Sequence, residues 1–513
     1  MESSNQSLMK PIMGTQISAK ALLWLILIAY VVFAAITIAH HEPWGDELHS
    51  WNIAKASTGF FNLIHNTRYE GHPPVWYIVM WAIAQFTHNF FYVQMFHLVF
   101  AVLVVYIILF YSPFSIATKA LIPFGYYFLF EYAVISRNYV IGILAGFLIC
   151  IVITKEFKYK TLLYYALLLV MSNTHLLAML LAGSLHLYFL LLNIEEKKKR
   201  NTIIFHLLMG AIIFLPAIYF IVPPMDSELG VHDWRERWSV GQFAIDIQAP
   251  LRAFVPMPAW WKPYSFWNEQ FLLNLHERYS FLKVIYPLLA LLFIAIGCYL
   301  LRKDKKCIIL FLANIIVTFV IGNVLSLNTQ RYSGFIFIGF MMAYWLYIKN
   351  KPSLRNSNLI INSMLLIQMI AGFFMVFKDI NMPFSDSYKV ADVLKKVPVN
   401  GKVVTDYWTA ITINAYTDKP DYCIDIQKAV TFDLWQTDIT EIRKYPYRFC
   451  RGLDNLFKRE NINTAYFVAT DPPQIIAKTD SRLFSSFNVK LIYKEEGTMA
   501  KWSNLYLYQI NKL

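Results

Sequence analysis

The fold is decided where a long hydrophobic segment ends in a cluster of ionisable side chains. Residues 21–39 read ALLWLILIAYVVFAAITIA, and residues 40–47 continue with HHEPWGDE, which places two histidines and three carboxylates within eight positions. The hydrophobic part has about twenty residues without a charge, which at ~1.5 Å per residue covers the roughly 30 Å hydrocarbon core of a bilayer. A second polar cluster, RYEGHPP at residues 68–74, precedes the next hydrophobic sequence. We therefore expect the loop at residues 40–90 to carry the functional site.

The composition excludes an ordinary soluble protein. Of the 513 residues, 57% are hydrophobic and 17% aromatic, and the mean hydropathy is +0.43, whereas soluble domains have a lower apolar share. The net charge of +13 would suggest nucleic-acid binding in a soluble domain, but the basic residues sit in short runs between apolar segments, as at 195–200 and 302–306. This arrangement is typical of a polytopic membrane protein, so we expect membrane lipids and no nucleic acid as partners.

Twelve apolar stretches are candidates for membrane helices. They are residues 21–39, 75–86, 91–111, 116–132, 139–154, 161–172, 176–192, 203–222, 281–301, 307–325, 332–348 and 359–377. The positive-inside rule places the basic turns between them, and an N-terminal tail at residues 1–20, in the cytoplasm. The sides counted from the N-terminal tail agree with the sides counted from the later basic turns only if one stretch does not cross. We assign this role to the short stretch at 75–86, which follows two prolines and is expected to lie along the membrane interface. We therefore predict an α-helical domain at residues 21–377 with about eleven transmembrane helices.

A soluble domain is expected at residues 378–513, where the hydrophobicity falls. Residues 403–405, 465–468, 489–493 and 505–508 have the composition of strands, and residues 390–396 have the pattern of a helix. These elements predict a C-terminal α/β domain, which the charge rule places on the extracytoplasmic side. In such an oxidising compartment Cys423 and Cys450 could form a disulfide bond, although their geometry does not follow from the sequence.

The adjacent acids Asp46 and Glu47 are the leading candidates for acid–base chemistry. On a helix they diverge by about 100°, so at most one of them can act on a given substrate atom. Asp46 has a structural alternative as the N-cap of an amphipathic helix that runs through Leu48, Trp51 and Ala54. A capping role leaves the Arg, Glu and His residues of the cluster at 68–74 without an explanation, which favours a functional role for Asp46.

Further polar and aromatic residues fall at predicted helix ends on the same side of the membrane. They are Glu131, Arg137, Tyr139, His175, Arg331 and Tyr332. Some have ordinary alternatives: Arg137 could extend to the lipid headgroups, and His175 could be a hydrogen-bonded structural histidine. Cations around a carboxylate at the membrane surface suit a reaction that expels a phosphate from a lipid carrier, because charge-assisted hydrogen bonds stabilise the departing group.

The order of these motifs resembles that of the GT-C glycosyltransferases. It runs from Asp46-Glu47 after the first span, through GHPP at 71–74, SRNY at 136–139 and His175, to Arg331-Tyr332. The resemblance is closest to bacterial members similar to the dolichyl-phosphate-mannose-protein mannosyltransferases and the aminoarabinose transferases. It covers residues 21–377, and a soluble C-terminal domain is also typical of the class. The sequence departs from the pattern at Asn138, where many relatives have proline.

The resemblance implies an inverting transfer of a sugar from a polyprenyl-phosphate-linked donor to an extracytoplasmic glycan, lipid or protein acceptor. The reaction would take place at the outer face of a bacterial cytoplasmic membrane. Asp46 aligns with the acid that deprotonates the acceptor hydroxyl, and Glu47 aligns with its partner. The substrate-binding positions that the resemblance implies are Arg68, Tyr69, His72, Glu131, Arg137, Tyr139, His175, Arg331 and Tyr332.

Within this set, the resemblance implies different roles. Arg137 and Arg331 would neutralise the lipid phosphate, and Glu131 would replace a second acid that relatives carry after the arginine. His72 and His175 would donate hydrogen bonds to the phosphate or the sugar. Neither a cofactor nor a catalytic metal is implied. The side chains that could in principle bind a metal are His40, His41, Asp46 and His49. Their spacing fits no standard pattern of metal ligands.

A long loop at residues 223–280 is rich in tryptophan and proline, with DWRERW at 233–238 and PAWW at 258–261. It is either an interfacial belt, because Trp and Tyr favour the headgroup level, or a lid over a lipid-linked substrate.

Two other functions fit the same sequence. A transporter or flippase for lipid-linked sugars would carry ionisable groups at mid-membrane depth, as His97 and His186 do, whereas most of the charge collects at one face. A non-catalytic assembly subunit with the same fold would tolerate the loss of Asp46.

Overall fold

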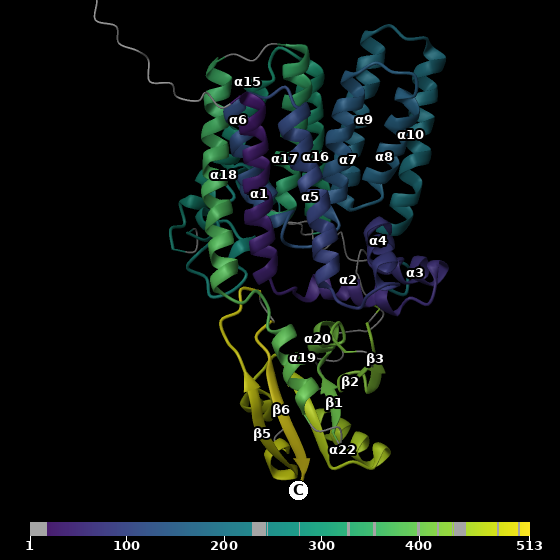
Figure 1. The fold of residues 1–513 in the computed structure, drawn as a ribbon, viewed down its shortest axis with the longest axis vertical. Coiled ribbons are helices and arrows are strands. Elements are labelled where there is room, and N and C mark those ends of the chain that lie inside the picture. Colours follow the sequence, from purple (N-terminus) through teal and green to yellow (C-terminus); the bar gives the residue numbers. More distant parts are fainter. Residues whose placement is uncertain are drawn as a thin grey trace, which may run out of the picture.

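The protein consists of a bundle of long helices with a smaller α/β domain at one end (Figure 1). The computed structural model describes residues 18–227, 243, 245–275, 278–325, 329–351, 355–397, 401–417, 420–432, 434–435, 448–479, 482–500 and 503–513. Three short helices, α2 (Gly45–Ala56), α3 (Phe60–Thr67) and α4 (Val75–Ala84), lie at the base of the bundle beside this domain. We call this end of the bundle the domain end, and the opposite end the far end.

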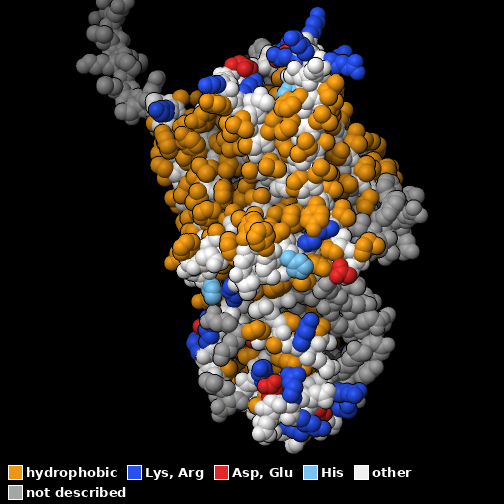
Figure 2. Space-filling view, turned by 90° about the vertical axis from the view of Figure 1, so that its right-hand side faces the viewer, with side chains coloured by type: hydrophobic (Ala, Val, Ile, Leu, Met, Phe, Trp, Pro, Cys, Tyr) orange, Lys and Arg blue, Asp and Glu red, His pale blue; other side chains and the backbone are white. Residues whose placement is uncertain are grey.

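Long uncharged segments form the bundle. Its main helices are α1 (Ala19–His40), α5 (Phe91–Tyr111), α7 (Tyr139–Thr154), α8 (Lys160–Ser172), α9 (Leu176–Glu195), α10 (Arg200–Ile221), α15 (Leu282–Leu300), α16 (Lys305–Leu325), α17 (Gln330–Asn350) and α18 (Arg355–Asn381). Within the described parts of the chain, seven helices are long and apolar enough to cross a bilayer: α1, α5, α9, α10, α15, α16 and α18. A hydrophobic band covers the face seen in Figure 2, and Lys and Arg gather at its far end. The chain therefore has the features of a polytopic membrane protein, as expected from its composition.

Helix α17 runs through the interior of the bundle. All its side chains from Ser333 to Tyr347 are buried, and it packs against α7, α9 and α16. A Cβ atom added at Gly339 would collide with Asn314 of α16, so glycine allows the two backbones to approach closely. This packing fixes Arg331, in the first turn of α17, at the domain end of the bundle core.

The predicted helix at residues 116–132 is broken. The structure has α6 (Ile116–Leu121), then the 3₁₀ turn η1 (Ile122–Phe124), and then the π-helix η2 (Tyr127–Glu131). Pro123 lacks an N–H group and crowds the preceding turn, and Gly125 adopts an extended conformation, so a continuous α-helix cannot form. A single membrane-spanning α-helix at this position was therefore the wrong expectation.

The stretch predicted to lie at the interface forms α4, a helix of 10 residues. At ~1.5 Å per residue it is about 15 Å long, too short to cross the hydrocarbon core. Helices α7 and α8 are also shorter than a full span, with 16 and 13 residues. The total of eleven crossings therefore stays a prediction.

The C-terminal domain is built on a six-stranded sheet with the order β3-β2-β1-β4-β6-β5. The strands are β1 (Lys402–Thr405), β2 (Asp421–Cys423), β3 (Lys428–Val430), β4 (Thr464–Ala469), β5 (Phe487–Lys494) and β6 (Tyr506–Lys512). Strand β1 pairs in parallel with β2 and β4, and the other pairs are antiparallel. The helices of this domain are α19 (Ser387–Lys396), α20 (Tyr407–Ile413), α22 (Arg448–Glu460), α23 (Pro473–Thr479) and α24 (Leu483–Ser486). Each predicted strand and the predicted helix at 390–396 correspond to one of these elements.

Two details of the C-terminal region differ from expectation. Helix α18 continues to Asn381, beyond the predicted domain boundary at 377, so Asp379 belongs to the bundle. Cys423 in β2 and Cys450 in α22 are both buried, and no disulfide bond joins them, so the pairing considered from the sequence is not formed.

Helix α2 joins the two parts of the molecule. Its Asn52 donates a hydrogen bond to the carbonyl of Ile411 in α20 at 2.7 Å, and the Lys55 ammonium donates to the carbonyls of Asn414 at 2.8 Å and Thr417 at 3.0 Å. The last carbonyls of a helix have no partner within the helix, so Lys55 also stabilises the end of α20. The C-terminal domain is thus attached to the helix that carries the Asp46-Glu47 pair.

The long loop at 223–280 contributes both buried and exposed tryptophans. Trp267 is buried, and its ring centroid lies 5.6 Å from that of Trp44 and 4.7 Å from that of Phe384. Trp260 and Trp261 are 49% and 44% exposed, as an interfacial belt requires. Residues 233–238 lie outside the described residues, and the alternative that this loop is a lid stays a prediction.

Candidate functional site

A cavity of about 330 Å³ opens at the junction of the bundle and the C-terminal domain. Five residues predicted for the site line it: Asp46, His72, Arg137, Arg331 and Tyr332. They come from α2, from the loop after α3, from the turn before α7 and from the start of α17. Residues separated by almost three hundred positions in the sequence therefore meet around one space.

Asp46 lies in the first turn of α2 and pairs with two arginines. Its Oδ2 is 2.9 Å from Arg331 Nη1 and 3.8 Å from Arg137 Nη2, and Arg137 also donates a hydrogen bond to the backbone carbonyl of Asp46. The Asp46 side chain keeps 36% of its surface exposed, whereas both arginines are mostly buried. Burial raises the pKa of Asp46, but Arg137 and Arg331 outweigh it and hold the pKa below its ordinary value. Asp46 is therefore a carboxylate at neutral pH.

Aromatic rings hold the Arg331 guanidinium in place. It lies over the rings of Trp44 and Tyr332, 5.5 and 4.9 Å from their centroids, and its Nη2 donates to the Tyr332 hydroxyl at 3.1 Å. Such cation–π contacts restrict a long side chain without neutralising its charge. Among the described residues, the buried Nε–H groups of Arg331 and Arg137 have no hydrogen-bond partner, so both arginines have unused donors.

A second acid, Glu70, faces the cavity beside Asp46. It accepts hydrogen bonds at 3.1 Å from His49 Nε2 and from the Tyr77 hydroxyl. Burial raises the pKa of Glu70, but the neighbouring His49 outweighs it, so the pKa is lowered overall. The sequence places Glu70 in the polar cluster and His49 one helical turn after Asp46, but neither is among the predicted catalytic or substrate-binding residues. Only the structure shows that they face each other.

His72 also lines the cavity, and it is neutral. Burial and the charge of Arg137 lower its pKa to about 4, and its buried Nδ1 has no hydrogen-bond partner in the described parts of the chain. Behind it lies His175, with a distance of 5.0 Å between ring centroids, and Tyr139 packs on His175 at 4.7 Å. The Nδ1 atom of His175 accepts the backbone N–H of Leu177 and so caps α9. His175 and Tyr139 therefore support the cavity from behind instead of lining it.

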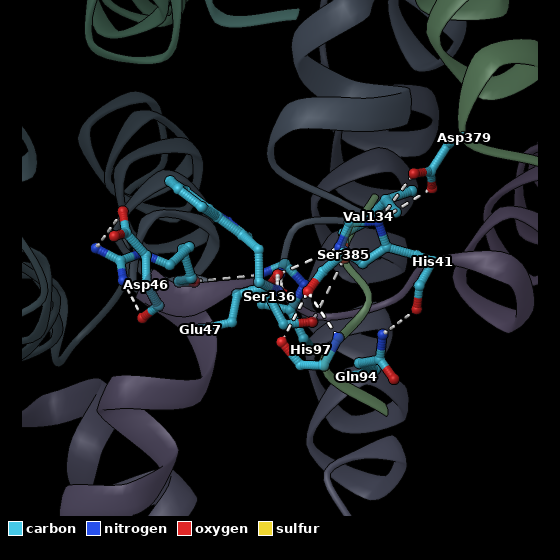
Figure 3. Close-up of polar contacts among 12 residues, drawn as sticks. His41, Asp46, Glu47, Gln94, His97, Val134, Ser136, Asp379 and Ser385 are labelled. Atoms are coloured by element: carbon cyan, nitrogen blue, oxygen red, sulfur yellow. Dashed lines mark hydrogen bonds and ion pairs between the residues drawn. The ribbon is translucent and has the colours of Figure 1, made fainter. Parts of the chain in front are cut away.

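Glu47 turns away from the cavity into a closed polar network (Figure 3). Its Oε1 accepts the Ser136 N–H at 2.7 Å, and its Oε2 lies 3.2 Å from both His41 Nε2 and the Trp44 N–H group, which it caps. His41 Nδ1 is 3.1 Å from both carboxylate oxygens of Asp379. We call Asp379, His41, Glu47 and Ser136 the Glu47 network. Glu47, not Asp46, caps α2, so the capping alternative for Asp46 was wrong.

The Glu47 network excludes solvent and carries a positive charge at its centre. The side chains of His41, Glu47 and Asp379 have no exposed surface. Burial alone lowers the pKa of His41, but the carboxylates of Asp379 and Glu47 outweigh it and raise the pKa to about 10. A buried imidazolium thus connects α18 to the first turn of α2, and through Ser136 to the turn that carries Arg137.

Three other predicted residues point elsewhere. The guanidinium of Arg68 lies 4.3 Å from the Tyr219 ring centroid, and the Tyr69 hydroxyl donates to Asp226 at 3.1 Å. Glu131 is buried in η2 and accepts a hydrogen bond from a neighbouring tyrosine at 2.9 Å. None of the three lines the cavity. Arg68 and Tyr69 contact the domain end of α10 and the loop after it instead.

The metal site considered from the sequence is not assembled. His41 pairs with Glu47 and Asp379, His49 pairs with Glu70, and His40 Nδ1 lies 2.8 Å from its own helix at the Ile36 carbonyl. Over the described residues there is no group of three or more His, Cys, Asp or Glu side chains arranged to hold a metal ion.

The two histidines that favour a transporter, His97 and His186, have structural partners. His97 lies within 3.2 Å of the carbonyls of Ala133 and Arg137, and so supports the turn before α7. His186 is 2.9 Å from the Tyr164 hydroxyl and 3.1 Å from the His206 carbonyl, which links α8, α9 and α10.

No protein-family model matches the sequence, and no curated protein is significantly similar to it.

Proposed function

We propose that this protein is a GT-C-type glycosyltransferase that transfers a sugar from a polyprenyl-phosphate donor to an extracytoplasmic acceptor, with inversion. The observation that carries the proposal is the pairing of one partly exposed carboxylate, Asp46, with Arg137 and Arg331 in a cavity at the domain end. Two fork-shaped guanidinium groups suit a phosphate, and a carboxylate between them suits proton abstraction beside it.

In the proposed reaction each of these groups has one role, and the proton and the leaving group are both accounted for. Asp46 accepts the proton of an acceptor hydroxyl while the hydroxyl oxygen attacks the anomeric carbon of the donor sugar. The bond between that carbon and the phosphate oxygen breaks, and its electron pair leaves with the polyprenyl phosphate. Arg137 and Arg331 stabilise the charge on the departing phosphate, and neutral His72 can donate a hydrogen bond without adding charge. Attack opposite the leaving group inverts the anomeric centre.

Donor binding would make Asp46 more basic, because the donor phosphate competes with Asp46 for Arg137 and Arg331. Paired with Arg137 and Arg331, Asp46 has a lowered pKa and is a weak base. A donor phosphate attracts the same guanidinium groups and weakens both ion pairs. The pKa of Asp46 then rises toward the range in which it accepts a proton.

The distribution of charge supports the proposed orientation. Lys and Arg gather at the far end of the bundle (Figure 2), and the positive-inside rule favours that end for the cytoplasm. The cavity and the C-terminal domain would then face the extracytoplasmic side of a bacterial cytoplasmic membrane, with about eleven crossings in total.

A transporter or flippase of lipid-linked sugars is the second candidate. The observation in its favour is the presence of His97 and His186 inside the bundle, because ionisable groups at this depth mark many transport pathways. Both rings have hydrogen-bonding neighbours that hold helices together, which favours structural roles. An assembly subunit without activity is distinguished by its tolerance of Asp46→Asn.

The test uses purified protein in lipid vesicles with a panel of polyprenyl-phosphate sugars and candidate acceptors. We expect one donor to yield free polyprenyl phosphate together with an inverted glycoside, identified by NMR of the anomeric proton. Asp46→Asn should reduce this release by about a hundredfold or more while the protein stays folded. The matched control is Asp392→Asn, a change in an exposed carboxylate of α19. Full turnover by Asp46→Asn would remove Asp46 as the base, and movement of an unchanged donor across the vesicle membrane would favour the transporter.

A further inference from the structure

The C-terminal domain forms part of the cavity wall. Five lining residues belong to it: Trp408, Ile411, Thr412, Trp435 and Ser503. Their side chains are uncharged, whereas the cationic groups of the cavity, Arg137 and Arg331, belong to the bundle. The cavity therefore has a charged part suited to a phosphate and an uncharged part that is aromatic and hydroxyl-bearing.

The uncharged part lies close to Asp46. A Cβ atom added at Gly45 would lie 3.8 Å from Thr412 Cγ2, so α20 touches the first turn of α2. The Trp435 ring centroid is 5.1 Å from that of His49, one helical turn after Asp46. A ligand that packs against Trp408 and Trp435 in the same cavity is therefore held within reach of the proposed base.

The position of this wall is fixed by α2 itself. Asn52 and Lys55 hold the end of α20 through hydrogen bonds to backbone carbonyls. Trp408 and Thr412 lie on α20, so their distance from Asp46 depends on one helix–helix contact and not on the full path of the chain. The C-terminal domain is thus placed as a component of the site.

The chemistry of the wall favours a sugar ring. Indole rings present large flat apolar surfaces, against which the C–H face of a pyranose packs, and Ser and Thr hydroxyls exchange hydrogen bonds with sugar hydroxyls. A phosphorylated or otherwise anionic acceptor would call for cations, and none of the described residues that line this part of the wall is cationic.

We propose that the C-terminal domain selects the acceptor, and that the acceptor is a glycan whose neutral sugar packs against Trp408 and Trp435 and presents a hydroxyl to Asp46. The proposal rests on the proposed function and assigns the charged part of the cavity to the donor phosphate. The donor also carries a sugar, so the experiment must separate the two sugars.

The first arm measures binding without turnover. Methyl glycosides are titrated into the full-length Asp46→Asn protein, and saturation-transfer NMR records binding. Trp408→Ala and Trp435→Ala in this background should each weaken binding by about tenfold, because truncation of a packed aromatic residue at a binding site commonly has an effect of this size. The matched control is Trp260→Ala, a 49% exposed tryptophan that does not line the cavity.

The second arm measures turnover with the active donor. In otherwise native protein the two substitutions should raise the KM for a glycan acceptor about tenfold and leave the KM for the donor within about twofold. Trp408→Phe and Trp435→Phe keep an aromatic face and should restore most of the affinity, which separates lost packing from misfolding.

The outcomes separate this proposal from the proposed function. Glycoside binding that depends on both tryptophans supports the inference even if no donor in the panel is used. Binding that is unchanged in both alanine variants overturns it, and so does a rise in donor KM alone, which would assign the wall to the donor sugar. Saturable glycosylation of a peptide that carries no sugar would also overturn it.

Discussion

Asp46 and Glu47 are neighbours in the sequence but belong to two different regions. The cavity surrounds Asp46 with guanidinium groups and leaves 36% of its side chain exposed. The Glu47 carboxylate is surrounded by two backbone N–H groups and an imidazolium, and has no exposed surface. The difference arises because successive side chains on a helix point about 100° apart, so α2 presents one acid to each region.

In the proposed function, environment and not residue type assigns the two acids to different tasks. A carboxylate that exchanges arginine partners with a substrate phosphate can change its basicity during a reaction. A carboxylate enclosed between His41 and Ser136 cannot exchange partners without opening the core. We therefore interpret Glu47 as a positioning residue that holds the Ser136-Arg137 turn against the first turn of α2, and Asp46 as the reactive acid.

The largest contrast between the regions is expected in stability. Glu47→Ala leaves the buried His41 with a single carboxylate partner and the Ser136 N–H without an acceptor. Removing one partner of a buried pair typically costs about 3–5 kcal/mol. Asp46→Ala also removes a charged partner, but the side chain that it truncates is 36% exposed in an open cavity, where water can replace the carboxylate, so we expect a smaller loss of stability. Thermal unfolding in detergent, followed by intrinsic fluorescence, should give a much lower midpoint for Glu47→Ala. Equal midpoints for the two variants would remove the distinction between the regions.

A second prediction concerns the arginines of the cavity. If the proposed function is right, Arg331→Ala should raise the KM for the polyprenyl-phosphate donor by about 10- to 100-fold, because hydrogen bonds to a charged group contribute about 1.5–3 kcal/mol. Arg331→Lys keeps the charge but loses the forked geometry, so an intermediate value is expected. Arg68→Ala is the control, since Arg68 packs on Tyr219 outside the cavity and should leave donor use unchanged. A comparable loss in Arg68→Ala would show that the donor site extends beyond the cavity.

A third prediction is a difference of sign in the pH dependence of stability. The pKa of His41 is raised from 6.5 to about 10, so its stabilisation is complete below pH 6.5 and is lost as the pH rises through 10. The pKa of His72 is lowered from 6.5 to about 4, so the unfolded chain takes up its proton first and stability falls as the pH drops from 6.5 toward 4.

The measurement is the unfolding midpoint between pH 4 and pH 10 for the native protein, His41→Gln and His72→Gln. His41→Gln should flatten the alkaline side of the profile, and His72→Gln should flatten the acid side. Parallel profiles for all three proteins would show that neither histidine has a shifted pKa in the folded state.

Much of the fold follows from continuous runs of apolar residues. The stretches predicted at 91–111 and 139–154 coincide with α5 and α7, because polar residues or a turn bound each run on both sides. The break at Pro123 could have been anticipated from its missing N–H group, but the π-helical turn that follows depends on packing against α18. In the C-terminal domain, β2 and β3 are only three residues long, too short for a periodic pattern to reveal them.

The sequence by itself determined the depth of each segment relative to the apolar layer. Hydrophobicity sets where each segment enters and leaves the apolar layer, so Asp46, Arg137 and Arg331 could be assigned to one level from the ends of their segments. It did not determine which segments are neighbours at that level, because apolar side chains in a bundle pack against many possible partners. The pairing of His41 with Asp379 across 338 positions, the contact of His49 with Glu70, and the contribution of Trp408 and Trp435 to the cavity were decided by tertiary packing alone.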